Sequence, residues 1–262
     1  MKRGPVVWTL DIETFPIEAY VWDIWEQNVG LNQIKEEWSI ASYCAKRLGS
    51  SEIRYEDTGG RGKTKTRDDS KLLPGLRRLL DEADIIIAQN GKKFDLRKIR
   101  ARFLMAGIKP PSPVRVIDTK IAVKKVAAVT STRLEWLAKY LTDTPKSEHK
   151  KFPGFELWLE CLADNPAAWA EMRRYNKIDV VSTEKLYLRL RPWMDDHPNL
   201  ATYGPTDKPQ CIACASENLQ PRGQHVTQQN AFNRYVCGDC GKWGHTKASL
   251  LTKAERQALL VN

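Results

Sequence analysis

Three short acidic motifs, in a fixed order along the 262-residue chain, most constrain what it can fold into. The first motif, DIET at residues 11–14, ends the apolar run 6–10, and such a run predicts a buried strand. Asp11 and Glu13 are two residues apart, so a strand directs both carboxylates to one face. The sequence therefore predicts a pair of acidic side chains at the end of a core strand.

The second and third motifs add acidic side chains to other predicted elements. NGKKFD at residues 90–95 follows the apolar run 85–88, another predicted strand, and its Asp95 opens a helical stretch. Tyr175 and Asp179, in the third motif YNKID, are four residues apart in a helical pattern and so share a face. Carboxylates gathered at one point repel one another unless cations neutralise them, which predicts a site for two hard divalent ions.

The order of the predicted elements indicates an α/β fold, a mixed sheet flanked by helices. Three strands come first, and helices and strands alternate after them. The expected strands are residues 5–11, 19–26, 38–48, 84–88 and 114–117, with a short edge piece at 52–56. The expected helices are residues 72–83, 95–106 and 166–190, with further helices beginning near 118 and 133, and the expected loops are 58–70 and 142–156.

This set of motifs resembles the DEDD family of 3′–5′ exonucleases in the ribonuclease H-like superfamily. Tyr175, four residues before Asp179, is typical of the tyrosine (DEDDy) type, whereas the histidine type would have His at the place of Arg174. The resemblance extends over residues 5–193 and is greatest to the proofreading domain of family B DNA polymerases. It implies a ribonuclease H-like fold and metal-dependent hydrolysis of phosphodiester bonds.

The resemblance also implies a role for each acidic residue. Asp11 would bridge two Mg²⁺ or Mn²⁺ ions, Glu13 and Asp179 would hold the ion beside the nucleophile, and Asp95 would hold the second ion largely through water. Tyr175 would orient the attacking water, because a phenol with a pKa near 10 acts more naturally as a hydrogen-bonding guide than as a base.

Four further residues beside the first two motifs would contact the terminal nucleotide in such an enzyme. They are Thr14, Phe15, Asn90 and Phe94. The ring of Phe15 would stack on a base, and its alternative is a place in the hydrophobic core.

Two CxxC pairs near the C-terminus predict a second metal site. Cys211 and Cys214 form one pair, Cys237 and Cys240 form the other, and 22 residues separate them. Each pair can bind the same tetrahedral ion from a tight turn, so we expect one structural Zn²⁺ in a zinc ribbon with a β-hairpin between its two turns. Four thiolates would complete the coordination shell, which leaves His225 and His245 as exposed residues, and Cys44 and Cys161 are expected to be buried.

The role of the predicted ribbon has two interpretations. It stabilises the fold, since so short a segment needs its metal to fold, or it also grips nucleic acid. The residues expected to form such a grip are Arg222, Arg234, Lys242, Trp243 and Lys247.

The net charge of +10 favours a polyanionic partner, although a solvated surface would also explain it. Basic residues gather near the predicted acidic site and in neighbouring loops. They are Arg61, Lys63, Lys65 and Arg67, then Lys92, Lys93, Arg97, Lys98, Arg100 and Arg102, then Lys146, His149, Lys150 and Lys151. No apolar run approaches the ~20 residues that span a bilayer, and no signal peptide is evident, so we expect a cytoplasmic protein of a bacterium or a phage-infected cell.

From these patterns we expect a ribonuclease H-like exonuclease domain at residues 1–194, a linker at 195–209 and a zinc ribbon with a C-terminal helix at 210–262. The expected activity is 3′–5′ hydrolysis of single-stranded DNA to nucleoside 5′-monophosphates by a standalone enzyme with replication or recombination proteins as partners. Two alternatives are an exoribonuclease that trims RNA 3′ ends and a nucleic-acid-binding adaptor without catalytic activity.

Overall fold

The computed structural model describes residues 4–144, 149 and 151–260 of the chain. The chain divides into two compact units, a larger one over Val6–Tyr187 and a smaller one that consists of the residues before Val6 and the chain from Leu188 onward. Among the described residues, no helix combines the length and the apolar character needed to cross a lipid bilayer.

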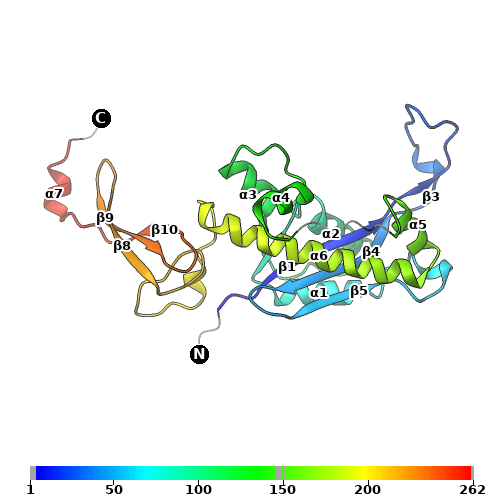
Figure 1. Cartoon of the computed structure of the whole chain (residues 1–262), viewed down its shortest axis with the longest axis horizontal. Coiled ribbons are helices and arrows are strands. Elements are labelled where there is room, and N and C mark those ends of the chain that lie inside the picture. Colours follow the sequence, from blue (N-terminus) through cyan, green and yellow to red (C-terminus); the bar gives the residue numbers. More distant parts are fainter. Residues whose placement is uncertain (1–3, 145–148, 150, 261–262) are drawn as a thin grey trace. The chain divides into compact units, whose positions relative to one another are not determined.

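A five-stranded mixed sheet forms the centre of the larger unit, with strand order β5-β4-β1-β6-β7 (Figure 1). The central strand β1 pairs antiparallel with β4 and parallel with β6, and β7 continues the parallel side. The strands are β1 (Val7–Phe15), β4 (Ser39–Arg47), β5 (Ile53–Asp57), β6 (Ile85–Ala88) and β7 (Arg115–Asp118).

Helices cover both faces of this sheet, which confirms the predicted α/β fold. On one face, Trp8, Leu10 and Ile12 of β1 pack with apolar residues of α1 and α2. On the other face, Phe15 packs with Trp169 and Met172 of the long helix α6. The helices are α1 (Leu73–Glu82), α2 (Asp95–Met105), α3 (Thr119–Val126), α4 (Leu134–Leu141), α5 (Glu156–Leu162) and α6 (Pro166–Leu190), with the 3₁₀ turn η2 at Lys63–Lys65.

The alternation of β1 decides what faces α6. Even-numbered residues enter the core beneath α1 and α2, so the odd-numbered Asp11, Glu13 and Phe15 face the other way. The sequence pattern ended this strand at residue 11, but β1 continues to Phe15 because β4 pairs with it along its whole length.

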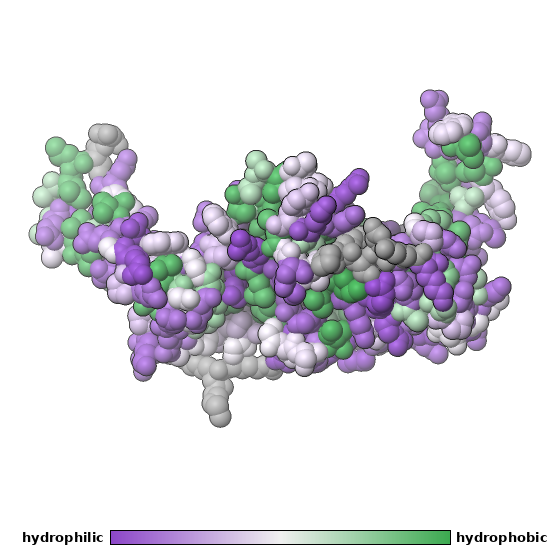
Figure 2. Space-filling view, viewed as in Figure 1, coloured by the Kyte–Doolittle hydropathy of each residue, from purple (hydrophilic) through white to green (hydrophobic). Residues whose placement is uncertain are grey.

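The predicted strand at 19–26 is wrong. Only Glu18–Ala19 (β2) is extended and paired, with β3 (Ile34–Glu36), and the 3₁₀ turn η1 (Leu31–Gln33) precedes β3. The aromatic residues that suggested a strand have no neighbouring strand, and Trp22 is 98% exposed. Figure 2 shows hydrophobic residues gathered on the surface of the segment that connects β2 to β3. The basic segment around His149 lies partly outside the described residues, as do Lys146 and Lys150 in it.

The smaller unit contains a three-stranded antiparallel sheet of order β10-β9-β8. Its expected hairpin is β8 (Leu219–Val226) with β9 (Ala231–Cys237), and β10 (Trp243–His245) pairs on the other side of β9. The other elements are the 3₁₀ turns η3 (Arg191–Trp193) and η4 (Leu200–Tyr203) and the short helix α7 (Lys253–Gln257). Within the expected linker, the Leu200 N–H donates to the Ile212 carbonyl oxygen over 2.7 Å.

Candidate active site and cysteine cluster

Three of the predicted acidic residues meet between β1 and α6. One carboxylate oxygen from each of Asp11, Glu13 and Asp179 lies within 4.8 Å of the others. Asp11 and Glu13 come from the face of β1 that α6 covers, and Asp179 comes from α6 itself. The two-residue spacing on the strand and the position of one helix therefore bring together groups 166 to 168 residues apart in sequence.

Asn176 holds Asp11 in this cluster. Its side-chain amide donates to the Asp11 carboxylate, and its side-chain oxygen accepts a hydrogen bond from the Ser42 hydroxyl over 3.1 Å. Both Asn176 and Ser42 are fully buried. One side chain of α6 thus links β1 and β4, and sequence reasoning gave it no role although it lies inside the third motif.

Asp95 lies at the start of α2, beside the same strand. Its Oδ1 accepts a hydrogen bond from the Ile12 backbone N–H over 3.1 Å, and the residue is 2% exposed. Because Ile12 lies between Asp11 and Glu13, this bond places the Asp95 carboxylate beside the part of β1 that carries both. The negative charge of Asp95 raises the pKa of Asp11. All four predicted carboxylates therefore belong to one electrostatic cluster.

The loop before Asp95 is fixed by Asp118, at the end of β7. The Asp118 carboxylate accepts from the Asn90 N–H over 3.0 Å and from the Lys92 N–H over 3.1 Å, and it also caps α3. A Cβ at Gly91 would lie 2.4 Å from the Cβ of Ala88, so glycine is required by this close approach. The sequence predicted that Asp118 begins a helix, which is confirmed, but its bonds to the loop were not predicted.

The electrostatics of the cluster fit a cation. Burial first, and then repulsion from Glu13, Asp95 and Asp179, raises the pKa of Asp11 well above its usual value. Burial also raises the pKa of Asp95 to about 7. A set of oxygen donors whose charges oppose one another is the donor chemistry of a hard divalent ion such as Mg²⁺ or Mn²⁺.

Tyr175 projects from α6 next to these carboxylates. It is 7% exposed and shares a hydrogen bond with Asp179. Burial first, and then the charges of Asp179, Glu13 and Asp11, raises the pKa of the Tyr175 phenol, so it stays protonated and can donate a hydrogen bond. The rings of His149 and Trp158 contact it edge-on, with centroids 5.2 and 6.4 Å away.

The predicted nucleotide contacts fall into two groups. Thr14 and Asn90 are partly exposed, and Phe94 is 36% exposed, so these three side chains can reach a ligand. Phe15 is fully buried and packs edge-on against Trp169, with ring centroids 6.0 Å apart. The core alternative therefore holds for Phe15, because a ring without exposed surface offers no face to a base.

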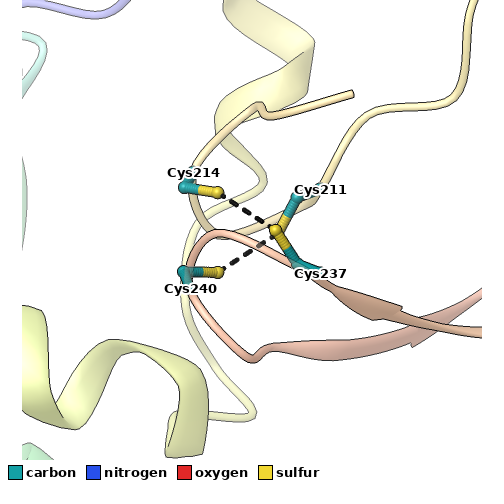
Figure 3. A group of neighbouring side chains, drawn as sticks. All are labelled: Cys211, Cys214, Cys237 and Cys240. Carbon is teal, nitrogen blue, oxygen red and sulfur yellow. Dashed lines mark hydrogen bonds between the residues drawn. The ribbon is translucent and has the colours of Figure 1, made fainter. Parts of the chain in front are cut away.

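The four cysteines of the CxxC pairs gather at one point of the smaller unit (Figure 3). Sγ of Cys211 lies 3.6 Å from Sγ of Cys240, and Sγ of Cys214 lies 3.6 Å from Sγ of Cys237. Burial opposes ionisation of Cys237, but the backbone N–H groups of Cys240 and Asp239 donate to it and lower its pKa to about 7. The donor set fits a tetrahedral Zn²⁺.

Two other cysteines and one lysine of the predicted nucleic-acid grip are buried. Cys44 and Cys161 are fully buried free thiols, as predicted. Lys242 is not available for a grip on nucleic acid, because it is buried and its Nζ donates to the Met194 carbonyl oxygen over 2.9 Å.

The sheet order and the acidic cluster define a protein of the ribonuclease H-like class. Residues 30–191 match the profile of the RNase_H superfamily, and the chain belongs to that superfamily. No protein with curated annotation matches the sequence.

Among solved structures, the chain is similar to the family B DNA polymerase from the hyperthermophilic archaeon Pyrobaculum calidifontis, with a TM-score of 0.55 and 18% sequence identity. The similarity covers 72% of this chain and 25% of the polymerase chain, so it corresponds to about a quarter of that protein's length. At this level of identity the likeness establishes the shared fold.

Proposed function

We propose that this chain is a 3′–5′ exonuclease that hydrolyses single-stranded DNA to nucleoside 5′-monophosphates with two divalent metal ions. The observation that carries the proposal is the convergence of Asp11, Glu13 and Asp179, with Asp95 bonded to the same strand and Tyr175 beside them. Such a cluster is unfavourable without a cation, and the superfamily fold supports its use on a nucleic acid.

Each residue has a role in this proposal. Asp11, Glu13, Asp95 and Asp179 would hold two Mg²⁺ or Mn²⁺ ions, which when bound activate water and stabilise charge on the attacking and leaving oxygens. Asn176 keeps the Asp11 carboxylate oriented, and Tyr175 retains its proton and directs a water by hydrogen bonding. We also infer that the four cysteines bind one Zn²⁺ that stabilises the smaller unit.

The test is to incubate the purified protein with end-labelled single strands, with and without Mn²⁺. We expect a ladder that shortens from the 3′ end only when Mn²⁺ is present, and no ladder with Asp11→Asn. DNA and RNA oligonucleotides of one sequence, and a duplex, are compared in parallel. Preference for RNA would favour the exoribonuclease alternative, whereas metal-independent binding without cleavage would favour an adaptor and refute the proposal.

A further inference from the structure

One face of the three-stranded sheet collects aromatic and basic side chains. Phe232 and Arg234 are two residues apart on β9, so they point to the same side. His225 of β8 pairs directly with Phe232, and His245 of β10 pairs directly with Arg234. Paired residues share a face, and Trp243, two residues before His245, joins them. We name this set, His225, Phe232, Arg234, Trp243 and His245, the stacking face.

These side chains form a continuous arrangement of flat groups. The rings of His225 and His245 are stacked, with centroids 4.6 Å apart and planes 4° apart. Phe232 lies 4.9 Å from His245, and the Arg234 guanidinium lies 5.1 Å from the centre of the Trp243 ring. Because both histidines and Arg234 are exposed and Trp243 is 51% exposed, the arrangement is open to solvent.

The stacking face is not explained by the folding of the ribbon. The hydrophobic cluster of the smaller unit consists of the four cysteines with Ala213 and Leu219. None of the rings of the stacking face belongs to this cluster. The four cysteines also supply a full set of zinc ligands without either histidine.

The charge of the three strands favours an anion. Strands β8, β9 and β10 contain Arg222 and Arg234 together with two histidines and no acidic residue. The Nε of Arg234 donates to the Arg222 carbonyl oxygen over 2.9 Å, which holds the guanidinium in place above Trp243. Flat rings beside fixed cations are the two components that bind unpaired bases and their phosphates.

We propose that the stacking face binds single-stranded nucleic acid, with bases stacked on Trp243 and the histidine pair and phosphates contacted by Arg234. Only the nature of the ligand rests on the function proposed above. This surface uses His225, Phe232 and His245 in addition to Arg234 and Trp243, and it excludes Lys242.

The test measures binding of a fluorescent single-stranded DNA of about 30 nucleotides to the zinc-loaded full chain, without added Mg²⁺ or Mn²⁺. Trp243→Ala should weaken binding about tenfold, and Trp243→Phe should largely restore it, because a base stacks on either ring. Arg234→Gln should weaken binding and reduce the slope of log affinity against log salt by about 0.7, the value for one phosphate contact on a single strand.

Trp22→Ala is the matched control, because Trp22 is an equally large exposed ring in the larger unit. It should bind as the wild type does. Zinc content, measured by atomic absorption, identifies a variant whose ribbon has unfolded. If Trp243→Ala has lost its zinc, the binding measured with Arg234→Gln alone tests the proposal. Wild-type affinity in zinc-loaded Trp243→Ala and Arg234→Gln would overturn the proposal.

A small substrate separates this proposal from the catalytic one. The p-nitrophenyl ester of thymidine 5′-monophosphate is too short to span two sites, so stacking-face variants should hydrolyse it at the wild-type rate while they degrade long DNA more slowly. If the wild type hydrolyses neither substrate but its binding still depends on Trp243, the exonuclease proposal fails and the stacking face stands. If it hydrolyses both and Trp243→Ala changes neither rate nor binding, the stacking face fails alone.

Discussion

The side-chain amide of Asn176 donates to the Asp11 carboxylate while its oxygen accepts from Ser42. A single buried side chain therefore orients the acidic residue that is repelled by all three other carboxylates of the cluster. We expect Asn176→Ala to lower kcat about 10- to 100-fold, as the loss of an outer partner of a metal ligand usually does. Steady-state kinetics with Mn²⁺ test this. Ser42→Ala should have a smaller effect, because Asn176 keeps its bond to Asp11, and an equal or larger loss would contradict this order.

Asp11→Asn should abolish hydrolysis and, at the same time, stabilise the metal-free protein. It removes the repulsion that the Asp11 carboxylate experiences from Glu13, Asp95 and Asp179. A gain of about 1 kcal/mol corresponds to a rise of ~2–4 °C in the Tm of a protein of this size. Differential scanning fluorimetry without added divalent ions measures it. A lowered Tm would show that repulsion between the carboxylates does not destabilise the metal-free protein. Asp95→Ala should likewise be inactive with its fold intact.

Metal affinity should rise with pH. The pKa of Asp95 is raised to about 7 in the folded protein, whereas an unfolded Asp titrates near 4. The stability that protonation of Asp95 contributes to the metal-free fold is therefore lost as the pH rises from about 4 through about 7, and a bound cation recovers it by replacing the proton. Titration calorimetry with Mn²⁺ at about pH 6 and about pH 8 should find tighter binding at the higher pH and proton release at the lower. A pH-independent affinity would contradict the assignment of Asp95.

Tyr175→Phe should lower kcat with a smaller effect on KM. The phenol is held protonated by burial and by the neighbouring carboxylates, so in the proposed mechanism it would contribute a hydrogen bond to water and not a transferred proton. We expect a loss of about 10- to 100-fold in rate, as for the loss of an outer partner in a metal site. A large rise in KM with an unchanged kcat would instead assign Tyr175 to substrate binding.

Cys237→Ser should unfold the smaller unit and leave the larger one folded. The four sulfur atoms provide most of the buried centre of the ribbon, whereas Val6–Tyr187 has its own hydrophobic core. We expect loss of one equivalent of zinc and of protection from proteolysis after residue 205, while hydrolysis of the small phosphodiester continues. Retained zinc would show that three thiolates and another ligand are sufficient.

The sequence predicted the sheet and the helices because each depends on a local pattern with a clear period, and it predicted the acidic cluster because the three motifs together resemble those of a known family. The strand expected at 19–26 failed for the opposite reason: aromatic residues favour strands, but pairing depends on a neighbour that this segment lacks beyond Ala19. The bond between Asn176 and Asp11 joins residues 165 positions apart, so no local pattern could indicate it. Sequence analysis named Arg234 and Trp243 but missed the two histidines of the stacking face, because these acquire a common side only through the register of three strands.

The position of β1 affects how this protein can be made. Among the strands of this sheet, β1 comes first in the sequence yet lies in the middle, with β4 on one side and β6 on the other. Until residues 39–47 and 85–88 follow, both its edges are unpaired, and its acidic face is uncovered until α6 is complete. A nascent chain that ends before residue 85 therefore exposes an apolar strand with at least one unpaired edge, and is prone to aggregate. Productive synthesis depends on shielding β1 until β6 has followed it.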